Sequence, residues 1–240
     1  MNVSTRRVRA IFRKELREYR RKRSIVAGMA ILPLIFLIQP LVVALTLPAS
    51  ASSQLAREHL LLYMLAIPAL VPAALAAYAV VGERQQGTLE PVLATPVRRE
   101  EFLLGKALAS FVPSVATAYA VYAMFLACVA LFARPAVTPA LLRGSDILAQ
   151  LLFTPLLAAW SIWLGIAISA RSSDVRVAQQ LGMLANLPSV VVTSLVAFNV
   201  IHPSLILAVS GAAVLLFLDR LGWRIVAATF NRERLITGTR

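Results

Sequence analysis

The sequence is poor in charge, in cysteine and in histidine. Of its 240 residues only 15% are charged, whereas 59% are hydrophobic, and the mean hydropathy is +0.78. A soluble domain has a more balanced composition. The single cysteine, Cys128, excludes a disulfide within the chain, and His59 and His202 have no cysteine partner with which to form a zinc site. This composition predicts an integral membrane protein.

Groupings that would indicate catalysis are also missing. No Ser/His/Asp or His/Glu grouping occurs at a useful spacing. Residues 82–87 have the glycine spacing of a phosphate loop, but Thr88 stands where the required lysine would be. The predicted spans contain no ionisable residue, which argues against an ion-coupled transporter or a proton pump. The chain is therefore expected not to be an enzyme, and to hold no cofactor and no metal of its own.

The sequence contains long runs without a charged residue. Six of them approach the length needed to cross a bilayer, namely 25–47, 60–82, 107–132, 147–170, 183–201 and 203–218. The remaining pieces are too short for a soluble domain, which needs at least about 50 residues. The prediction is an all-α integral membrane protein with six transmembrane helices. Terminal segments 1–24 and 219–240 and a loop over 83–106 lie outside these spans.

The last two runs leave room for alternatives. Residues 183–218 can form one long stretch, a span with a re-entrant segment, or two spans joined at 199–203. Two spans are favoured. Sixteen residues of helix rise only about 24 Å, so the sixth helix is expected to continue to Trp223, with Asp219 and Arg220 at the inner interface.

The distribution of basic residues predicts the orientation. There are 24 Lys and Arg residues against 11 Asp and Glu, and if the N-terminus is inside, only Arg57, Arg134 and Arg143 lie outside. The sequence thus predicts a multi-pass inner (plasma) membrane protein with both termini cytoplasmic. The basic run at 6–23 directly precedes the first span, so anionic lipid is its expected partner rather than nucleic acid.

The N-terminal segment has a helical pattern of its own. Apolar side chains recur at helical spacing opposite a basic face, at Val8, Ile11, Phe12, Leu16 and Tyr19. An amphipathic helix in the membrane interface is expected. Residues 223–240 show a weaker version of the same pattern.

The 83–106 loop is expected to fold rather than to hang free. Gly87 can end the second span, and Thr88 can cap a short helix with Glu90 at its positive end. Thr95 and Pro96 indicate a second helix start that leads into the third span.

The short helix in this loop carries an apolar patch. Leu89, Val92 and Leu93 are too few to form a core, and they either dock into a groove on a partner or rest on the bilayer surface. The residues alone favour neither alternative.

The stretch ERQQGTLEPVLATPVRREEFLLGK resembles the loop of type 2 permeases of ATP-binding-cassette (ABC) transporters. The matching positions are Glu83, Arg84, Gly87, Thr88, Leu89, Glu90, Leu93, Pro96, Gly105 and Lys106. Residues 13–16 and 230–233 are similar to weaker features of that family, and span number and order agree along the whole chain. Arg98 departs from the pattern, because the family often has a small capping residue there.

The resemblance implies an exporter subunit. It implies a homodimer or heterodimer of six-span subunits on two separate ABC ATPase subunits, which would carry ATP and Mg. The N-terminal segment would be a connecting helix that includes Arg13, Lys14 and Glu15. Residues 88–95 would be a coupling helix, with ATPase contacts from Gly87, Thr88, Leu89, Glu90, Leu93, Thr95 and Pro96. The alternative is a non-transporting membrane scaffold or sensor whose loop recruits a cytosolic partner.

Polar residues within the spans are the candidates for a substrate path. These are Tyr119, Tyr122, Asn186 and Thr193, although most such residues hydrogen-bond neighbouring helices. A cavity without charge favours an apolar or amphipathic substrate, and short outer loops disfavour a large macromolecule.

Overall fold

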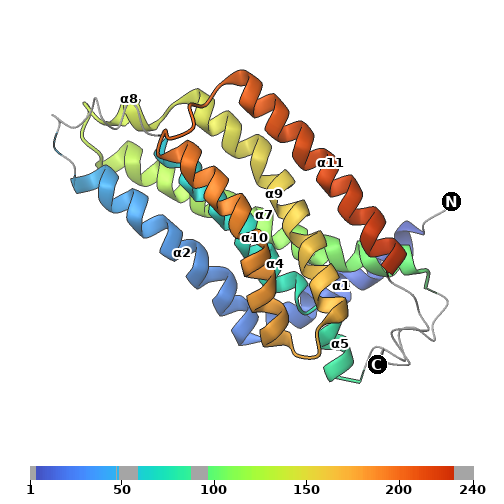
Figure 1. Ribbon diagram of the computed structural model, residues 1–240. Coiled ribbons are helices and arrows are strands. Elements are labelled where there is room, and N and C mark those ends of the chain that lie inside the picture. The colour runs from blue at the N-terminus through green and yellow to red at the C-terminus, as the bar shows by residue number, and fades with distance from the viewer. Residues whose placement is uncertain (1–3, 47, 49–58, 88–96, 230–240) are drawn as a thin grey trace.

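The computed structural model describes residues 4–46, 48, 59–87 and 97–229. Within these residues it contains six helical stretches that are long and apolar enough to cross a membrane. Figure 1 shows them as a bundle of long helices. They are α2 (Arg23–Thr46), the broken helix η2–α4–α5 (Leu60–Leu65, Ala66–Ala76 and Val81–Gln85), α7 (Arg99–Phe132), α8–α9 (Thr138–Leu141 and Gly144–Arg171), α10 (Val175–Ala197) and α11 (Leu205–Thr229). The predicted all-helical six-span fold class is confirmed.

Several helices extend beyond the charge-free runs from which they were predicted. Helix α7 begins at Arg99 instead of 107, and α10 begins at Val175 instead of 183. Charged side chains are disfavoured in hydrocarbon but not in the first turn of a helix, where Asp and Glu suit the helix dipole. Charge-free runs therefore underestimate the length of these helices.

The end of the chain shows the same effect. Residues 198–204 separate α10 from α11, and Asn199 adopts a left-handed conformation with φ 57°. Helix α11 continues to Thr229, past the predicted end near Trp223. Asp219, which is expected at the inner interface, lies within α11. Residues 219–229 are therefore part of the last helix.

Helix α4 is the centre of the bundle. The most apolar part of the second span is 89% buried, and α4 packs against α2, α7, α9 and α10. Small residues allow the closest approach to α9: a Cβ atom added to Gly165 would lie 2.6 Å from the Cβ of Ala76. Small residues at such crossings let helix backbones come together in membrane proteins.

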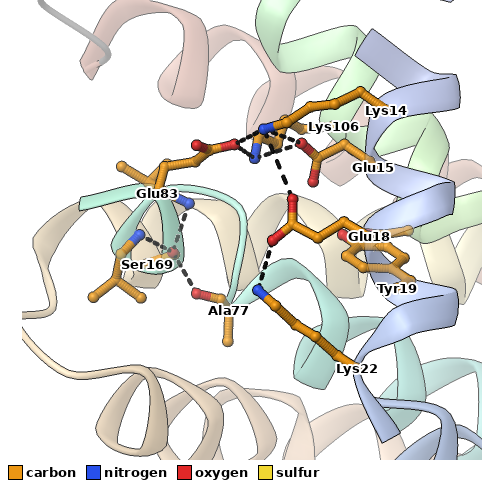
Figure 2. A network of polar contacts seen from close by, with 12 residues as sticks. Lys14, Glu15, Glu18, Tyr19, Lys22, Ala77, Glu83, Lys106 and Ser169 are labelled. Carbon is orange, nitrogen blue, oxygen red and sulfur yellow. Dashed lines mark hydrogen bonds and ion pairs between the residues drawn. The ribbon is translucent and has the colours of Figure 1, made fainter. Parts of the chain in front are cut away.

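A turn interrupts the second span between α4 and α5. Ser169 of α9 donates a hydrogen bond to the carbonyl of Ala77 (2.6 Å) and accepts from the backbone N–H groups of Val80 (3.1 Å) and Val81 (3.0 Å). Backbone groups freed inside a membrane protein need such partners. The serine therefore holds α5 in a fixed position, from which Glu83 points toward α1 (Figure 2).

The two ends of the bundle differ. Helix α1 (Thr5–Arg21) lies at the same end as α5, whereas α8 lies at the opposite end (Figure 1). At the α8 end, His59 Nδ1 lies 2.8 Å from Asp146 Oδ1, which joins the start of η2 to the start of α9. The end that holds α1 and α5 also leads into the 83–106 loop.

Candidate functional site

Helix α1 packs directly against the beginning of α7. A Cβ atom on Gly105 would lie 2.7 Å from the Cβ of Ile11, so only glycine allows this contact. Phe12 and Tyr19 pack against apolar side chains of the bundle, and the Tyr19 hydroxyl lies 3.3 Å from the Ser110 hydroxyl. Ile11, Phe12 and Tyr19 of the predicted apolar face therefore pack against other helices of the protein.

Charged side chains from α1, α5 and α7 form a cluster next to this contact (Figure 2). Glu83 of α5 accepts hydrogen bonds from Lys106 of α7 (2.7 Å) and Lys14 of α1 (2.6 Å). Glu15 of α1 lies 3.0 Å from the Lys106 ammonium and 3.4 Å from that of Lys14. We call Lys14, Glu15, Glu83 and Lys106 the charge cluster.

Three members of the charge cluster are almost completely buried. The exposed fractions are 2% for Lys106, 3% for Glu15 and 4% for Glu83. Burial of a charge is costly unless it is paired, and the two lysines and two glutamates balance each other. Partial burial alone would lower the pKa of Lys14, but its hydrogen bond to Glu83 and the nearby glutamates outweigh this effect and raise the pKa above its ordinary value. Lys14 is therefore held in its charged form.

A second contact ties α1 to the start of α7. Glu101 is 1% exposed and accepts hydrogen bonds from the backbone N–H of Ser4 (2.9 Å), the backbone N–H of Arg98 (3.0 Å) and the Arg7 guanidinium (3.2 Å). By accepting from Arg98, Glu101 caps the helix. Helix α7 begins at Arg99, whereas the helix start predicted at Thr95 and Pro96 lies outside the described residues.

The loop between α5 and α7 is thus anchored on both sides. Before the loop, Glu83 is held by the charge cluster, and Arg84 donates to the carbonyls of Ser172 (3.3 Å) and Ala170 (3.4 Å). Gly87 follows α5 in a left-handed conformation, φ 66°, and ends it as the sequence predicted. After the loop, Lys106 and Glu101 attach α7 to α1.

The predicted coupling helix lies outside the described residues. This applies to Thr88, Leu89, Glu90, Leu93, Thr95 and Pro96, whose contact with an ATPase stays a prediction. Of the connecting-helix residues, Lys14 and Glu15 belong to the charge cluster, whereas Arg13 is exposed.

The four predicted substrate-path residues mostly support the packing of helices. Tyr119 of α7 donates to the carbonyl of Leu151 on α9 (2.8 Å), and Asn186 donates to Gly182 of its own helix (2.8 Å). Tyr122 is buried within the bundle. Thr193 lines an apolar cavity between η2, α9, α10 and α11. Their role in a substrate path stays a prediction.

Sequence reasoning missed how these side chains are paired. Glu83 and Lys106 match positions of the loop pattern, but the sequence assigned a partner to neither. Ser169 and Asp146 were not singled out. A signal did exist: Lys106 and Glu83 each stand directly at the end of a long apolar run, where burial of the charge calls for a partner.

The fold defines a class: a helical membrane protein with six candidate spans and an anchored loop at one end. The family model described as ABC-2 family transporter protein matches residues 9–221. The chain therefore belongs to the ABC-2 transporter family and is a membrane subunit that acts in transport. A comparison with curated proteins finds no significant match.

Proposed function

We propose that this chain is the permease subunit of an ATP-driven exporter, working as a dimer on two separate ATPase subunits that bind ATP and Mg. The charge cluster is the observation that carries this proposal. It joins α1 to Glu83 before the loop and to Lys106 after it, through ion pairs of 2.6–3.0 Å. Anchors on both sides of the loop would pass a force on it to the helices that they join.

The connections of the loop define where a force on it would go. On one side α5 leads through the Ser169-supported turn into α4, the central helix of the bundle. On the other side the loop leads into α7, which α1 braces through Gly105 and Glu101. Closure of the ATPases against the loop would therefore move the second and third spans together with α1.

A cleft between α2, α4 and α10 suits a mainly apolar substrate. Its volume is about 340 Å³, within the range of small-molecule pockets, and most of its lining is aliphatic. Tyr78 and Gln179 add polar groups, and Gln179 donates a hydrogen bond to the Ala74 carbonyl (3.3 Å). We assign this cleft to an apolar or amphipathic substrate. Export as the direction rests on the family.

The experiment that tests the coupling role changes Leu93. Leu93→Arg places an unmatched charge in the proposed docking groove and should lower ATPase binding or stimulated ATPase activity by about two orders of magnitude, since about 1.4 kcal/mol corresponds to a factor of ten. Gln86→Arg is the matched control, because it adds the same charge at an exposed position of the same loop outside the apolar patch. Membrane insertion of both variants should be normal.

The result also separates the proposal from the alternative of a non-transporting scaffold or sensor. A scaffold would bind a cytosolic partner without stimulating ATP hydrolysis. If Leu93→Arg inserts normally and stimulates its ATPase like the wild type, the loop rests on the bilayer and the coupling role is lost. Saturable micromolar ATP binding by the isolated chain would contradict the assignment of the nucleotide site to a separate subunit.

A further inference from the structure

A groove runs along the outside of the bundle where α1 meets α2 and α7. Its volume is about 340 Å³, and Arg20, near the end of α1, lies at one end of it. Val26, Met29 and Ala30 form the α2 wall at i, i+3 and i+4 positions, and Pro113 and Thr117 form the α7 wall one helical turn apart. The groove therefore follows two membrane-spanning helices away from the cytosolic helix.

The course of the chain explains why the groove is open. Helix α1 ends at Arg21 and α2 begins at Arg23, so only Lys22 separates two helices of different direction. Tyr19 lies at the base of the resulting wedge, where it is buried and faces Ser110. Small side chains such as Ala30 leave the space between α2 and α7 unfilled.

The groove has a positive charge at its cytosolic end. Helix α1 carries eight basic and two acidic residues between Thr5 and Arg21. Both acidic residues already have partners: Glu15 contacts Lys106 (3.0 Å), and Glu18 contacts Lys22 (2.6 Å). The Arg20 side chain is exposed and makes no hydrogen bond or ion pair with any other residue that the structure describes. Its guanidinium is free to bind an anion, and guanidinium groups match phosphate oxygens well.

We propose that this groove binds one anionic phospholipid. The headgroup phosphate contacts Arg20, and an acyl chain lies between Met29 and Ala30 on one side and Pro113 and Thr117 on the other. Arg20 lies only five residues before the first charge-free run, which is the level of the headgroups next to a span. A zwitterionic lipid offers the same phosphate but adds a cation beside a strongly basic helix, so a net negative headgroup is preferred. The proposal is independent of the ATPase partnership.

The test is native mass spectrometry of the purified full chain, titrated with phosphatidylglycerol or phosphatidylcholine. The wild type should retain one phosphatidylglycerol more strongly than phosphatidylcholine. Arg20→Gln should weaken this retention about fivefold, the effect of one basic residue beside an anionic headgroup. Arg9→Gln removes the same charge from an exposed position of α1 outside the groove and should change retention less than twofold.

A second pair of variants tests the apolar part of the site. Ala30→Phe fills the groove and should abolish retention of the lipid, whereas Ala27→Phe adds the same side chain at an exposed α2 position outside the groove and should not. Equal effects of Arg20→Gln and Arg9→Gln would show diffuse attraction along α1 and overturn the proposal. Equal retention of the two lipids would overturn it as well. A lipid-free dimer that Ala30→Phe disrupts would identify the groove as a subunit contact and also contradict it.

Discussion

Individual buried charges attach α1 to α5 and α7. Lys106 lies within 3.0 Å of both Glu15 and Glu83, and neither glutamate has enough exposed surface to be solvated by water. In such a cluster, removal of one charge costs more than removal of a matched pair, because the remaining partner stays buried and uncompensated. The charge cluster therefore couples the stability of three helices to two residues on α1 and one residue each on α5 and α7.

Lys106→Met is expected to destabilise the protein by roughly 3–5 kcal/mol, since Glu15 and Glu83 are then left with Lys14 alone. The double variant Glu83→Gln with Lys106→Met should recover part of this loss. Thermal unfolding in detergent measures both. Strictly additive effects of the two substitutions would show that the ion pair contributes no coupling.

Gly105→Ala tests the contact between α1 and α7. The added methyl group would lie 2.7 Å from the Ile11 Cβ, an atom fixed to the backbone, so α1 must move. A loss of about 1–3 kcal/mol is expected, as for other overpacked sites. Gly28→Ala is the matched control, because a Cβ there has no neighbour within 4 Å. The control should be neutral or slightly stabilising, since alanine favours a helix more than glycine does. Equal unfolding temperatures of the two variants would contradict this packing.

At the scale of helices, the sequence predicts that a helix exists better than it predicts where the helix ends or which helices it contacts. Long apolar runs identify all six spans, since hydrocarbon excludes charge along about 20 residues. The ends are missed where a helix continues into charged turns, as at Arg99 and Val175. The charge cluster is missed because Lys14 and Glu83 are 69 residues apart and no periodic pattern connects them. Pairing of this kind depends on tertiary packing.

The start of α10 gives a prediction that depends on pH. Asp174 caps α10 by accepting from the backbone N–H groups of Arg176 (2.7 Å) and Val177 (3.4 Å), and it also accepts from Gln85 of α5 (3.3 Å). The hydrogen bond from Arg176 is the largest cause of a pKa below the ordinary value for Asp174. A lowered folded-state pKa gives stability that is present above the ordinary value of about 3.9 and is lost as the pH falls through the lowered one.

Asp174→Ala should therefore lower the unfolding temperature by roughly 2–4 °C at pH 7. Asp174→Asn should keep most of the cap at every pH, because an amide also caps a helix but does not titrate. The unfolding temperature of the wild type should fall relative to that of Asp174→Asn below about pH 4. A constant difference between pH 7 and pH 3 would show that the ionised carboxylate is not what stabilises α10.

At the scale of the whole molecule, the two ends of the bundle hold different polar contacts. The end with α1 and α5 holds the charge cluster and the anchored loop, and the opposite end holds α8 and the contact between His59 and Asp146 (Figure 1). If all six helical stretches cross the membrane, α1 and the end of α11 lie on the same side of it. The positive-inside rule favours the proposal that the α1 end faces the cytosol, where a partner ATPase would be.

Cysteine labelling tests this orientation. In a Cys128→Ala background, which removes the only native thiol, single cysteines at Ser53 and Thr138 should react with a membrane-impermeant maleimide added to intact cells, and a cysteine at Gln86 should react only after the membrane is opened. The expectation follows from the order along the chain: Ser53 lies between the first and second spans, Gln86 between the second and third, and Thr138 begins the short helix α8 that follows the third span. An even number of spans makes the three sites interdependent, so labelling of Gln86 in intact cells together with protection of Ser53 and Thr138 would invert the topology. In that case the charge cluster would face away from the cytosol, and no cytosolic ATPase could act on the loop that it anchors.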